Sequence, residues 1–135
     1  MEARLAVLGV DGVRNKGGKS FLAKGVQFKL DARGEVPVWL EARELEERVF
    51  ARLAGRAKLS VHDNVLWADC DLLDDRLPGS LMKIIYPHPC GNVMKTNGDT
   101  VEEILVDGIN LSADMPLDQR IVTLDAQGVK ARKKG

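Results

Sequence analysis

Aromatic residues are scarce in this chain of 135 residues, where three phenylalanines, two tryptophans and one tyrosine make up 4%. A protein that stacks nucleic-acid bases on aromatic rings would have to concentrate that function on a few positions. The chain also has only two cysteines and two histidines. Two cysteines form no disulfide framework, and the histidines stand in no nucleophile or acid–base arrangement. We therefore expect a protein that is not an enzyme and that uses no cofactor.

Long apolar runs are missing too. No stretch approaches the roughly 20 apolar residues that span a bilayer, and the sequence after Met1 lacks the pattern of a signal peptide. We expect no membrane partner and a cytoplasmic location. A hydrophobic fraction of 44% beside 30% charged residues is typical of a globular protein.

An excess of one charge is also absent, since 20 basic and 20 acidic residues cancel. Their distribution is nevertheless uneven. Acidic residues gather in 41–47 and 69–75, whereas residues 14–33 contain a single acid, Asp31. The basic residues of that strip are Arg14, Lys16, Lys19, Lys24, Lys29 and Arg33. Such a strip is typical of a polyanion site, although solvated charge on a hairpin is equally common.

The first half of the sequence, up to residue 73, predicts strands separated by turns. Residues 5–13 predict a strand with glycine breaks, 15–19 a glycine turn, and the alternation over 21–30 a half-buried strand. A third strand follows at 36–40, and Pro37 predicts that it lies at an edge of the sheet. Residues 56–61 and 65–73 predict two further strands, joined by the turn residues His62, Asp63 and Asn64.

A helix is predicted over residues 41–54. Its apolar residues Ala42, Leu45, Val49 and Leu53 recur at helical spacing, and Gly55 follows as a C-cap. A helix between the third and fourth of five strands is the plan of the OB-fold, a small barrel that often binds single strands.

A resemblance to a known family rests on two runs. Residues 40–66, "LEARELEERVFARLAGRAKLSVHDNVL", resemble the helix-then-strand core of OB-fold single-stranded DNA-binding proteins. Residues 10–31, "VDGVRNKGGKSFLAKGVQFKLD", resemble the first two strands and charged hairpin of that class, including small phage-encoded binders. The resemblance covers about residues 1–73. The ending "VKARKKG" departs from the acidic tip of the bacterial members.

The predicted fold class is therefore mainly β: an OB-like five-stranded barrel with one helix between strands 3 and 4, plus a β-rich C-terminal segment. We expect the barrel in residues 1–73, a linker in 74–79 and the β-rich extension in 80–135. In that extension, 81–86, 103–106 and 120–124 predict strands, while Asn97-Gly98 and Asp107-Gly108 predict turns. The extension could be a second β layer, a continuation of the barrel sheet, or an arm for oligomerisation or partner docking.

The predicted function is single-stranded DNA binding without catalysis, as in phage or plasmid DNA replication, with RNA as an alternative ligand and a homo-oligomer expected. The basic residues would neutralise phosphates and the aromatic ones would stack bases. The candidate nucleic-acid-binding residues are Arg14, Lys16, Lys19, Phe21, Lys24, Lys29, Trp39 and Trp67. The alternative for each tryptophan is a place partly in the core.

Two other interpretations remain open. One is a protein–protein interaction or phage assembly module that uses the C-terminal β segment. The other is a small inhibitor whose acidic runs at 41–47 and 69–75 mimic nucleic acid.

Three motifs carry weaker signals. "GGKS" at Gly17–Ser20 lacks the glycine and the helix of a phosphate loop, because Val13 stands where the glycine should be, and we expect a hairpin. The only soft metal ligands are His62, Cys70, His88 and Cys90, and only the last two are close in sequence, so we predict no metal site. We expect the aspartates at 69, 71, 74 and 75 to mark an exposed acidic strand end rather than a cation site.

Overall fold

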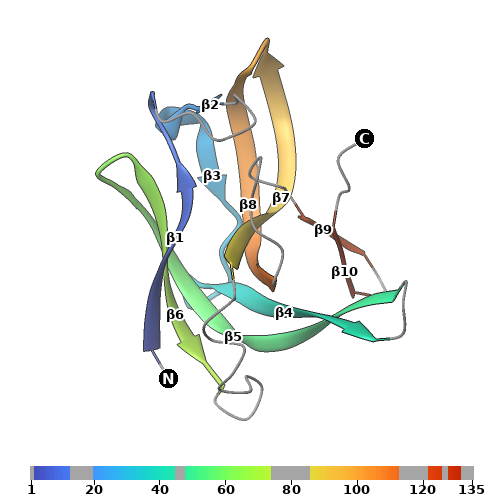
Figure 1. Cartoon of the computed structure of the whole chain (residues 1–135). Coiled ribbons are helices and arrows are strands. Elements are labelled where there is room, and N and C mark those ends of the chain that lie inside the picture. The colour runs from blue at the N-terminus through green and yellow to red at the C-terminus, as the bar shows by residue number, and fades with distance from the viewer. Residues whose placement is uncertain are drawn as a thin grey trace.

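The computed structural model describes residues 2–12, 20–44, 48–73, 86–112, 122–125 and 128–131. These residues form ten strands in one curled sheet (Figure 1). The strands are β1 (Glu2–Gly9), β2 (Ser20–Phe21), β3 (Val26–Phe28), β4 (Val36–Glu44), β5 (Arg48–His62), β6 (Val65–Leu72), β7 (Tyr86–Asn97), β8 (Thr100–Ser112), β9 (Val122–Asp125) and β10 (Gly128–Ala131). The prediction of a mainly β protein is confirmed.

The strand order in the sheet is β1-β6-β5-β4-β8-β7-β9-β10, and the short strands β2 and β3 pair with β8. In Figure 1, β1 stands opposite β7 and β8, while β6, β5 and β4 curve between them as a half-barrel. Strands from residues 1–73 and from 80–135 thus lie in one sheet, joined where β4 pairs with β8. The second half continues the first sheet, which is one of the arrangements expected for it.

One apolar core fills the inside of the curl. It contains Leu8 of β1, Leu66 of β6, Val38 of β4, and Ile104 and Ile109 of β8, all at most 1% exposed. The residues come from both halves of the chain, so neither half encloses this core alone. The proposed linker at 74–79 lies outside the described residues.

The predicted helix at 41–54 is wrong. Residues up to Glu44 belong to β4 and those from Arg48 onward to β5, and the two strands pair antiparallel. Helical spacing is a weak local preference, and here residues 48–53 pair with β4 while β5 continues from Gly55 into a ladder with β6. Gly55 is not a C-cap but a strand residue, where a Cβ would overlap the carbonyl oxygen of Asp71 on β6.

Of the predicted turns with glycine or asparagine, two are confirmed and one is wrong, while the glycine turn at 15–19 lies outside the described residues. Asp63 and Asn64 form the two-residue turn between β5 and β6, both with positive φ (50° and 61°), as a type I′ hairpin requires. The turn at Asn97-Gly98 places Gly98 at φ 59° between β7 and β8. The turn at Asp107-Gly108 is wrong, because β8 continues through it. The pairing of β8 with β7 shifts there: Cys90 faces Gly108 and Gly91 faces Val106, so Asp107 is an extra residue of β8 that faces no residue of β7.

Two strand predictions also need correction. The strand expected at 21–30 is divided into β2, a 3-10 helix η1 (Ala23–Gly25) and β3. Pro37 does not mark an edge, since β4 lies between β5 and β8. The pairing of β4 with β8 begins only at Val38, so it does not require the amide hydrogen that proline lacks.

Among the described residues, no helix has the length and apolar character to cross a bilayer.

Candidate functional site

The outer face of β1, β6 and β5 carries charges of both signs in cross-strand rows. One row is Glu2, Asp71 and Arg56, and the next is Arg4, Asp69 and Lys58. Directly opposed residues share a face, so three carboxylates and three basic groups lie together and their charges sum to zero. Arg4 and Asp69 approach to 3.6 Å. We call this surface the charged face; it is not a positive track for phosphates.

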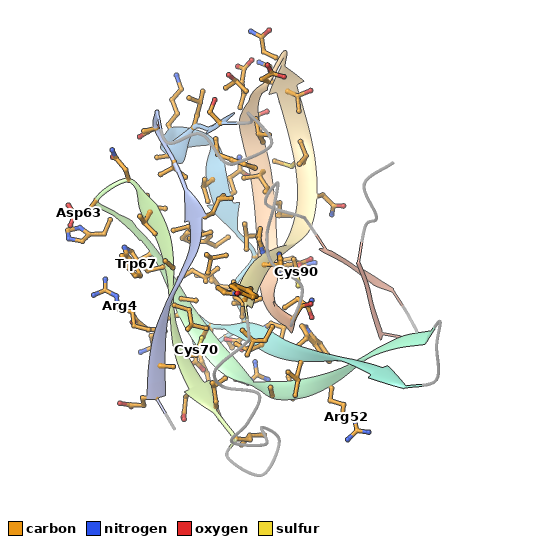
Figure 2. All side chains as sticks on the ribbon, viewed as in Figure 1. Arg4, Arg52, Asp63, Trp67, Cys70 and Cys90 are labelled. Carbon is orange, nitrogen blue, oxygen red and sulfur yellow. The ribbon has the colours of Figure 1, made fainter. Side chains whose placement is uncertain are left out.

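Trp67 lies in the next row of the charged face, between Ala6 and Ser60. The Arg4 guanidinium lies 4.6 Å from the centroid of its ring, within the range of a cation–π contact. Its indole N–H donates to the carbonyl oxygen of His62 at 3.0 Å. Figure 2 shows Arg4 and Trp67 next to each other on the side of β1 and β6 away from β7 and β8. One ring face and the N–H of Trp67 are therefore already engaged within the chain.

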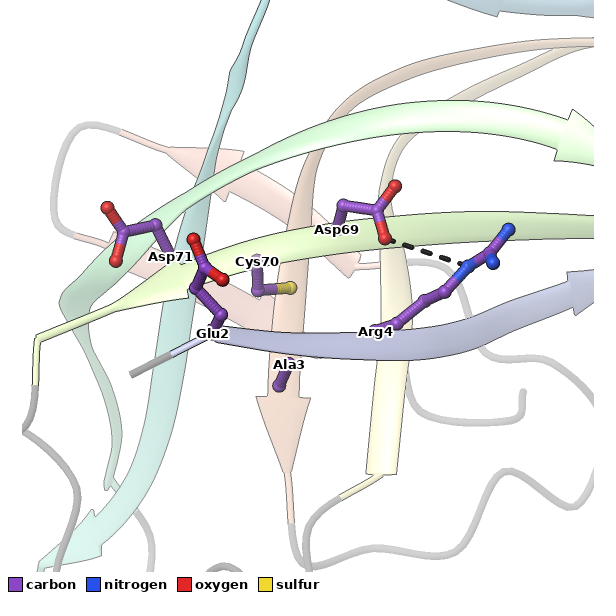
Figure 3. A pocket seen from close by; sticks show the side chains of 6 residues that line it. All are labelled: Glu2, Ala3, Arg4, Asp69, Cys70 and Asp71. Atoms are coloured by element: carbon purple, nitrogen blue, oxygen red, sulfur yellow. Dashed lines mark ion pairs between the residues drawn. The ribbon is translucent and has the colours of Figure 1, made fainter.

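A surface pocket on β1 and β6 is acidic (Figure 3). Glu2, Asp69 and Asp71 line it with Arg4, Ala3 and Cys70. Its carboxylates outnumber its single guanidinium, so it would repel phosphate. Burial, together with the charge of Asp69, raises the pKa of the Cys70 thiol to about 11. Cys70 is therefore protonated at neutral pH and is not a nucleophile or a ready metal ligand.

The predicted nucleic-acid-binding residues are not all surface groups. Phe21 is only 2% exposed and belongs to the apolar core, so its ring is covered and not presented on the surface for stacking. Its position at the end of β2, paired with Val101 of β8, turns the ring inward. Lys24 on η1 and Lys29 just after β3 are exposed. Arg14, Lys16 and Lys19 lie outside the described residues.

Trp39 also points away from the apolar core, but it lies on β4 in a different row from Trp67. It stands between Val38 and Leu40, which both belong to the apolar core, so it points away from that core. Its neighbours in the sheet are Leu53 on β5 and Asn110 on β8. Asn110 in turn faces His88 on β7. Leu53, Trp39, Asn110 and His88 thus form one row across four strands, which we call the polar row.

Burial changes steeply along the polar row. Leu53 is 40% exposed and Trp39 is partly exposed, whereas Asn110 and His88 are 0% and 1% exposed. Ile109 and Leu111, on either side of Asn110, face the apolar core. This end of β8 is therefore covered on both faces. On the same side as Asn110, β8 places Gly108 and Ser112, and β7 places Cys90.

Polar atoms in the polar row are left without partners. The indole nitrogen of Trp39 and both the oxygen and the nitrogen of the Asn110 amide are buried and have no hydrogen-bond partner among the described residues. Burying such a group unpaired costs about 1–3 kcal/mol, so native proteins usually satisfy it with protein, water or ligand. His88 and Cys90 have interaction partners of their own.

The four potential soft metal ligands do not come together. His62 is exposed at the end of β5, with its Nε2 3.1 Å from a carboxylate oxygen of Asp63, and Cys70 is buried in the apolar core. His88 and Cys90 share one face of β7. Within the described part of the chain, no three His, Cys, Asp or Glu residues are grouped so as to hold a metal ion.

Sequence reasoning missed Asn110 entirely and noted His88 only as a possible metal ligand. The available signal was the alternation Ile109-Asn110-Leu111-Ser112, which predicts a strand with an apolar and a polar face. Because a turn was expected at Asp107-Gly108, the strand predicted at 103–106 was not extended to Asn110.

Comparisons of the chain with protein-family models, with curated proteins and with solved structures found no match.

Proposed function

We propose that the protein is a non-enzymatic binding module whose ligand occupies the polar row. The observation that supports it is Asn110, a fully buried amide with neither polar atom paired among the described residues. The unpaired N–H of Trp39 lies on the neighbouring strand. Native proteins usually satisfy such buried polar groups, and this unmet hydrogen-bonding capacity of two adjacent residues is the ground on which we propose a bound partner.

Burial favours retention of a ligand over turnover. A substrate must exchange with solvent in every cycle, and a site with Asn110 and His88 at most 1% exposed hinders that exchange. A resident ligand, by contrast, stabilises the fold in proportion to its affinity. The sealed end of the polar row therefore fits binding without catalysis.

Native mass spectrometry of the purified protein tests the proposal. We expect a mass above that of the polypeptide, which falls to the polypeptide mass on denaturation. The Asn110→Leu variant should lose the additional mass and stay folded, because leucine fills a similar volume without an unpaired amide. An identical mass before and after denaturation, with Asn110→Leu no more stable than the parent, would contradict the proposal.

A second candidate function is single-stranded nucleic-acid binding, favoured by the exposed Lys24 and Lys29. Both belong to the basic strip that includes Arg14, Lys16 and Lys19. If they neutralise phosphates, the change Lys24→Glu with Lys29→Glu should weaken oligothymidine binding. The salt dependence should also flatten, by about 0.7 in the log–log slope for each phosphate that is no longer neutralised. Fluorescence anisotropy at two salt concentrations measures both effects.

Lys58→Glu is the matched control, because Lys58 is also exposed but lies beside Asp69 on the charged face. Equal binding by the parent, the double variant and the control would exclude a role for Lys24 and Lys29.

A further inference from the structure

β1 is the end strand of the sheet and pairs with β6 along one of its two edges. It also approaches β7, but no ladder joins those two strands. Among the described residues, no strand pairs with the second edge of β1. Backbone N–H and C=O groups along an open edge are available to a strand from another molecule.

The N-terminal part of β1 is a regular strand that is accessible from outside. Its pairing with β6 is uninterrupted from Glu2 to Ala6, and the one irregularity follows between Ala6 and Leu8. Glu2, Arg4 and Ala6 are exposed, and beyond them the strand turns into the core, where Leu8 is buried. This part of the sequence contains no proline and no lysine, two residues that commonly protect an edge from pairing. The open edge is therefore Glu2–Ala6.

The charges on this edge select its partner. Glu2 directly faces Asp71 on β6, which carries the same charge. Two residues further on, Arg4 faces Asp69 and approaches it to 3.6 Å (Figure 3). A cation on the free side of Glu2 would offset the repulsion by Asp71. The edge therefore favours a strand that brings a basic residue opposite Glu2 and an acidic residue opposite Arg4.

A second copy of β1, running antiparallel, meets this requirement. When Ala3 faces the partner's Ala3, Glu2 faces the partner's Arg4, and Arg4 faces the partner's Glu2. A twofold axis between the two alanines relates the copies, as in an isologous dimer. A shift of two residues is the smallest that keeps each side chain on its face, and it would oppose Arg4 to Arg4 or Glu2 to Glu2. The charges thus favour one register.

We propose that the protein forms a homodimer in which the β1 strands of two copies pair antiparallel about Ala3. Two ion pairs cross the interface, each between Glu2 of one copy and Arg4 of the other, and Arg4 then lies between two carboxylates, this one and Asp69. So short a pairing buries less than the roughly 1,200 Å² of a standard interface, so the dimer is weak and depends on concentration. No residue of the polar row takes part, and dimer formation is therefore tested separately from ligand binding.

Sedimentation velocity of the full chain over a series of concentrations measures the association. We expect a monomer–dimer equilibrium for the parent. Glu2→Arg brings arginine opposite the partner's Arg4, and Arg4→Glu brings glutamate opposite the partner's Glu2. Each variant alone should therefore dimerise about tenfold more weakly, or less. An equimolar mixture of the two variants restores opposite charges at both crossings, and it should form heterodimers with the affinity of the parent dimer.

Two charge reversals away from the edge are the matched controls. Asp99→Arg lies in the exposed turn between β7 and β8, and Lys58→Glu lies on β5 in the charged face. Both should associate as the parent does. Circular dichroism shows whether each variant is folded. If Arg4→Glu does not fold, the comparison of Glu2→Arg with Asp99→Arg still decides.

Three results would overturn the dimer. The first is a parent that stays monomeric at every concentration. The second is a folded Glu2→Arg variant that associates as strongly as the parent. The third is a mixture of folded Glu2→Arg and Arg4→Glu that associates no better than either variant alone, because only direct pairing between the two positions predicts recovery.

Discussion

Gly25 illustrates how a single residue can be fixed by backbone contact. It ends η1, and a Cβ at this position would overlap the carbonyl oxygen of Glu102 on β8. The neighbouring amide and carbonyl groups already bond to β8, as Leu22 N–H does to Val101. The segment therefore has no freedom to move away without breaking these bonds. The sequence shows a glycine here, but not the strand that approaches it.

Gly25→Ala should destabilise the protein by about 3 kcal/mol or more, because the backbone of η1 or β8 must shift to admit the methyl group. Chemical denaturation followed by circular dichroism measures the change in stability. Gly34→Ala is the control: a Cβ there meets nothing within 4 Å, and only its φ of 76° opposes the change. We expect about 1 kcal/mol for the control. Equal destabilisation of the two variants would refute the role of the Glu102 carbonyl.

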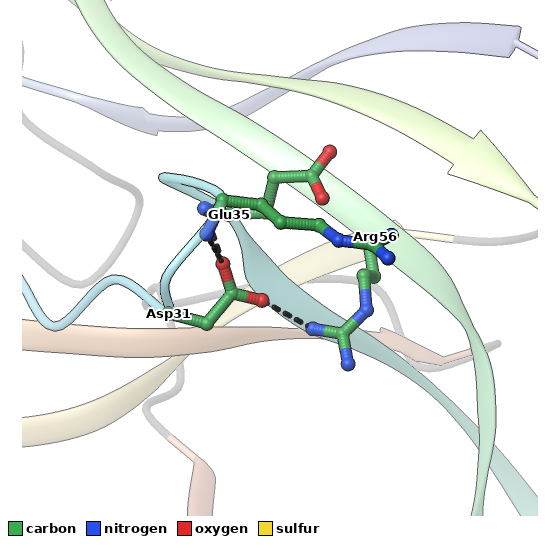
Figure 4. A network of polar contacts seen from close by, with 4 residues as sticks. Asp31, Glu35 and Arg56 are labelled. Carbon is green, nitrogen blue, oxygen red and sulfur yellow. Dashed lines mark hydrogen bonds and ion pairs between the residues drawn. The ribbon is translucent and has the colours of Figure 1, made fainter.

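Among the elements, the turn that leads into β4 depends on one carboxylate (Figure 4). One oxygen of Asp31 accepts the backbone N–H of Arg33 at 2.8 Å and that of Glu35 at 3.0 Å, and the other pairs with Arg56 of β5. The backbone of Asp31 adds bonds with Glu35 and Gly34. Asp31 thus links the turn to β5, the strand with which β4 pairs.

These contacts lower the pKa of Asp31 below its usual 3.8, chiefly through the Glu35 N–H. A carboxyl whose pKa is lower in the folded state stabilises the fold at neutral pH, and this stabilisation disappears as the pH falls through and below about 4. Asp31→Asn should therefore lower the Tm at pH 7 but change it less at pH 3. Asp99→Asn, in the exposed turn after Gly98, controls for the removal of a charge. A Tm difference between Asp31→Asn and parent that is the same at both pH values would contradict this.

The long hairpin of β4 and β5 also depends on pairing between strands. Its central residues have a helical pattern, yet β5 pairs over residues 48–57 with β4 and over 55–62 with β6. The ladder with β4 gives residues 48–53 hydrogen-bonded partners in place of those of a helix, and the same strand then continues into the ladder with β6. The choice between helix and strand was therefore made by pairing with the strands that precede and follow β5 in the chain, which helical spacing alone does not reveal.

Across the entire protein, one core joins both halves of the chain. Leu66 on β6 and Ile109 on β8 are fully buried in the same apolar cluster. A protein with one core should unfold as one cooperative unit, even though the sequence predicts two segments, 1–73 and 80–135.

Leu66→Ala and Ile109→Ala should each lower the stability by about 2–5 kcal/mol and each shift a single, common unfolding transition. Calorimetry with matched fluorescence and circular dichroism tests this. Leu73→Ala is the exposed control and should change little. Two separate transitions, each sensitive to only one of the core variants, would show that the halves fold independently.

Homo-oligomer formation and the alternative assembly role stay predictions about the entire protein. Sedimentation with and without oligothymidine separates them from nucleic-acid binding. Large assemblies indifferent to DNA would favour the assembly role.

Features controlled by local chemistry could be predicted from the sequence. Alternating apolar residues indicated a mainly β protein, and Asp63-Asn64 and Asn97-Gly98 formed turns because their residues tolerate positive φ. Three other features depended on the folded sheet. It made a hairpin of the expected helix, buried Phe21, and joined Trp39, Asn110 and His88 in one row. For Phe21 and the row, pairing between strands distant in the chain determines which face each side chain occupies, and no local pattern encodes that pairing. For the hairpin, the ladders of β5 with β4 and β6 outweigh the local helical spacing.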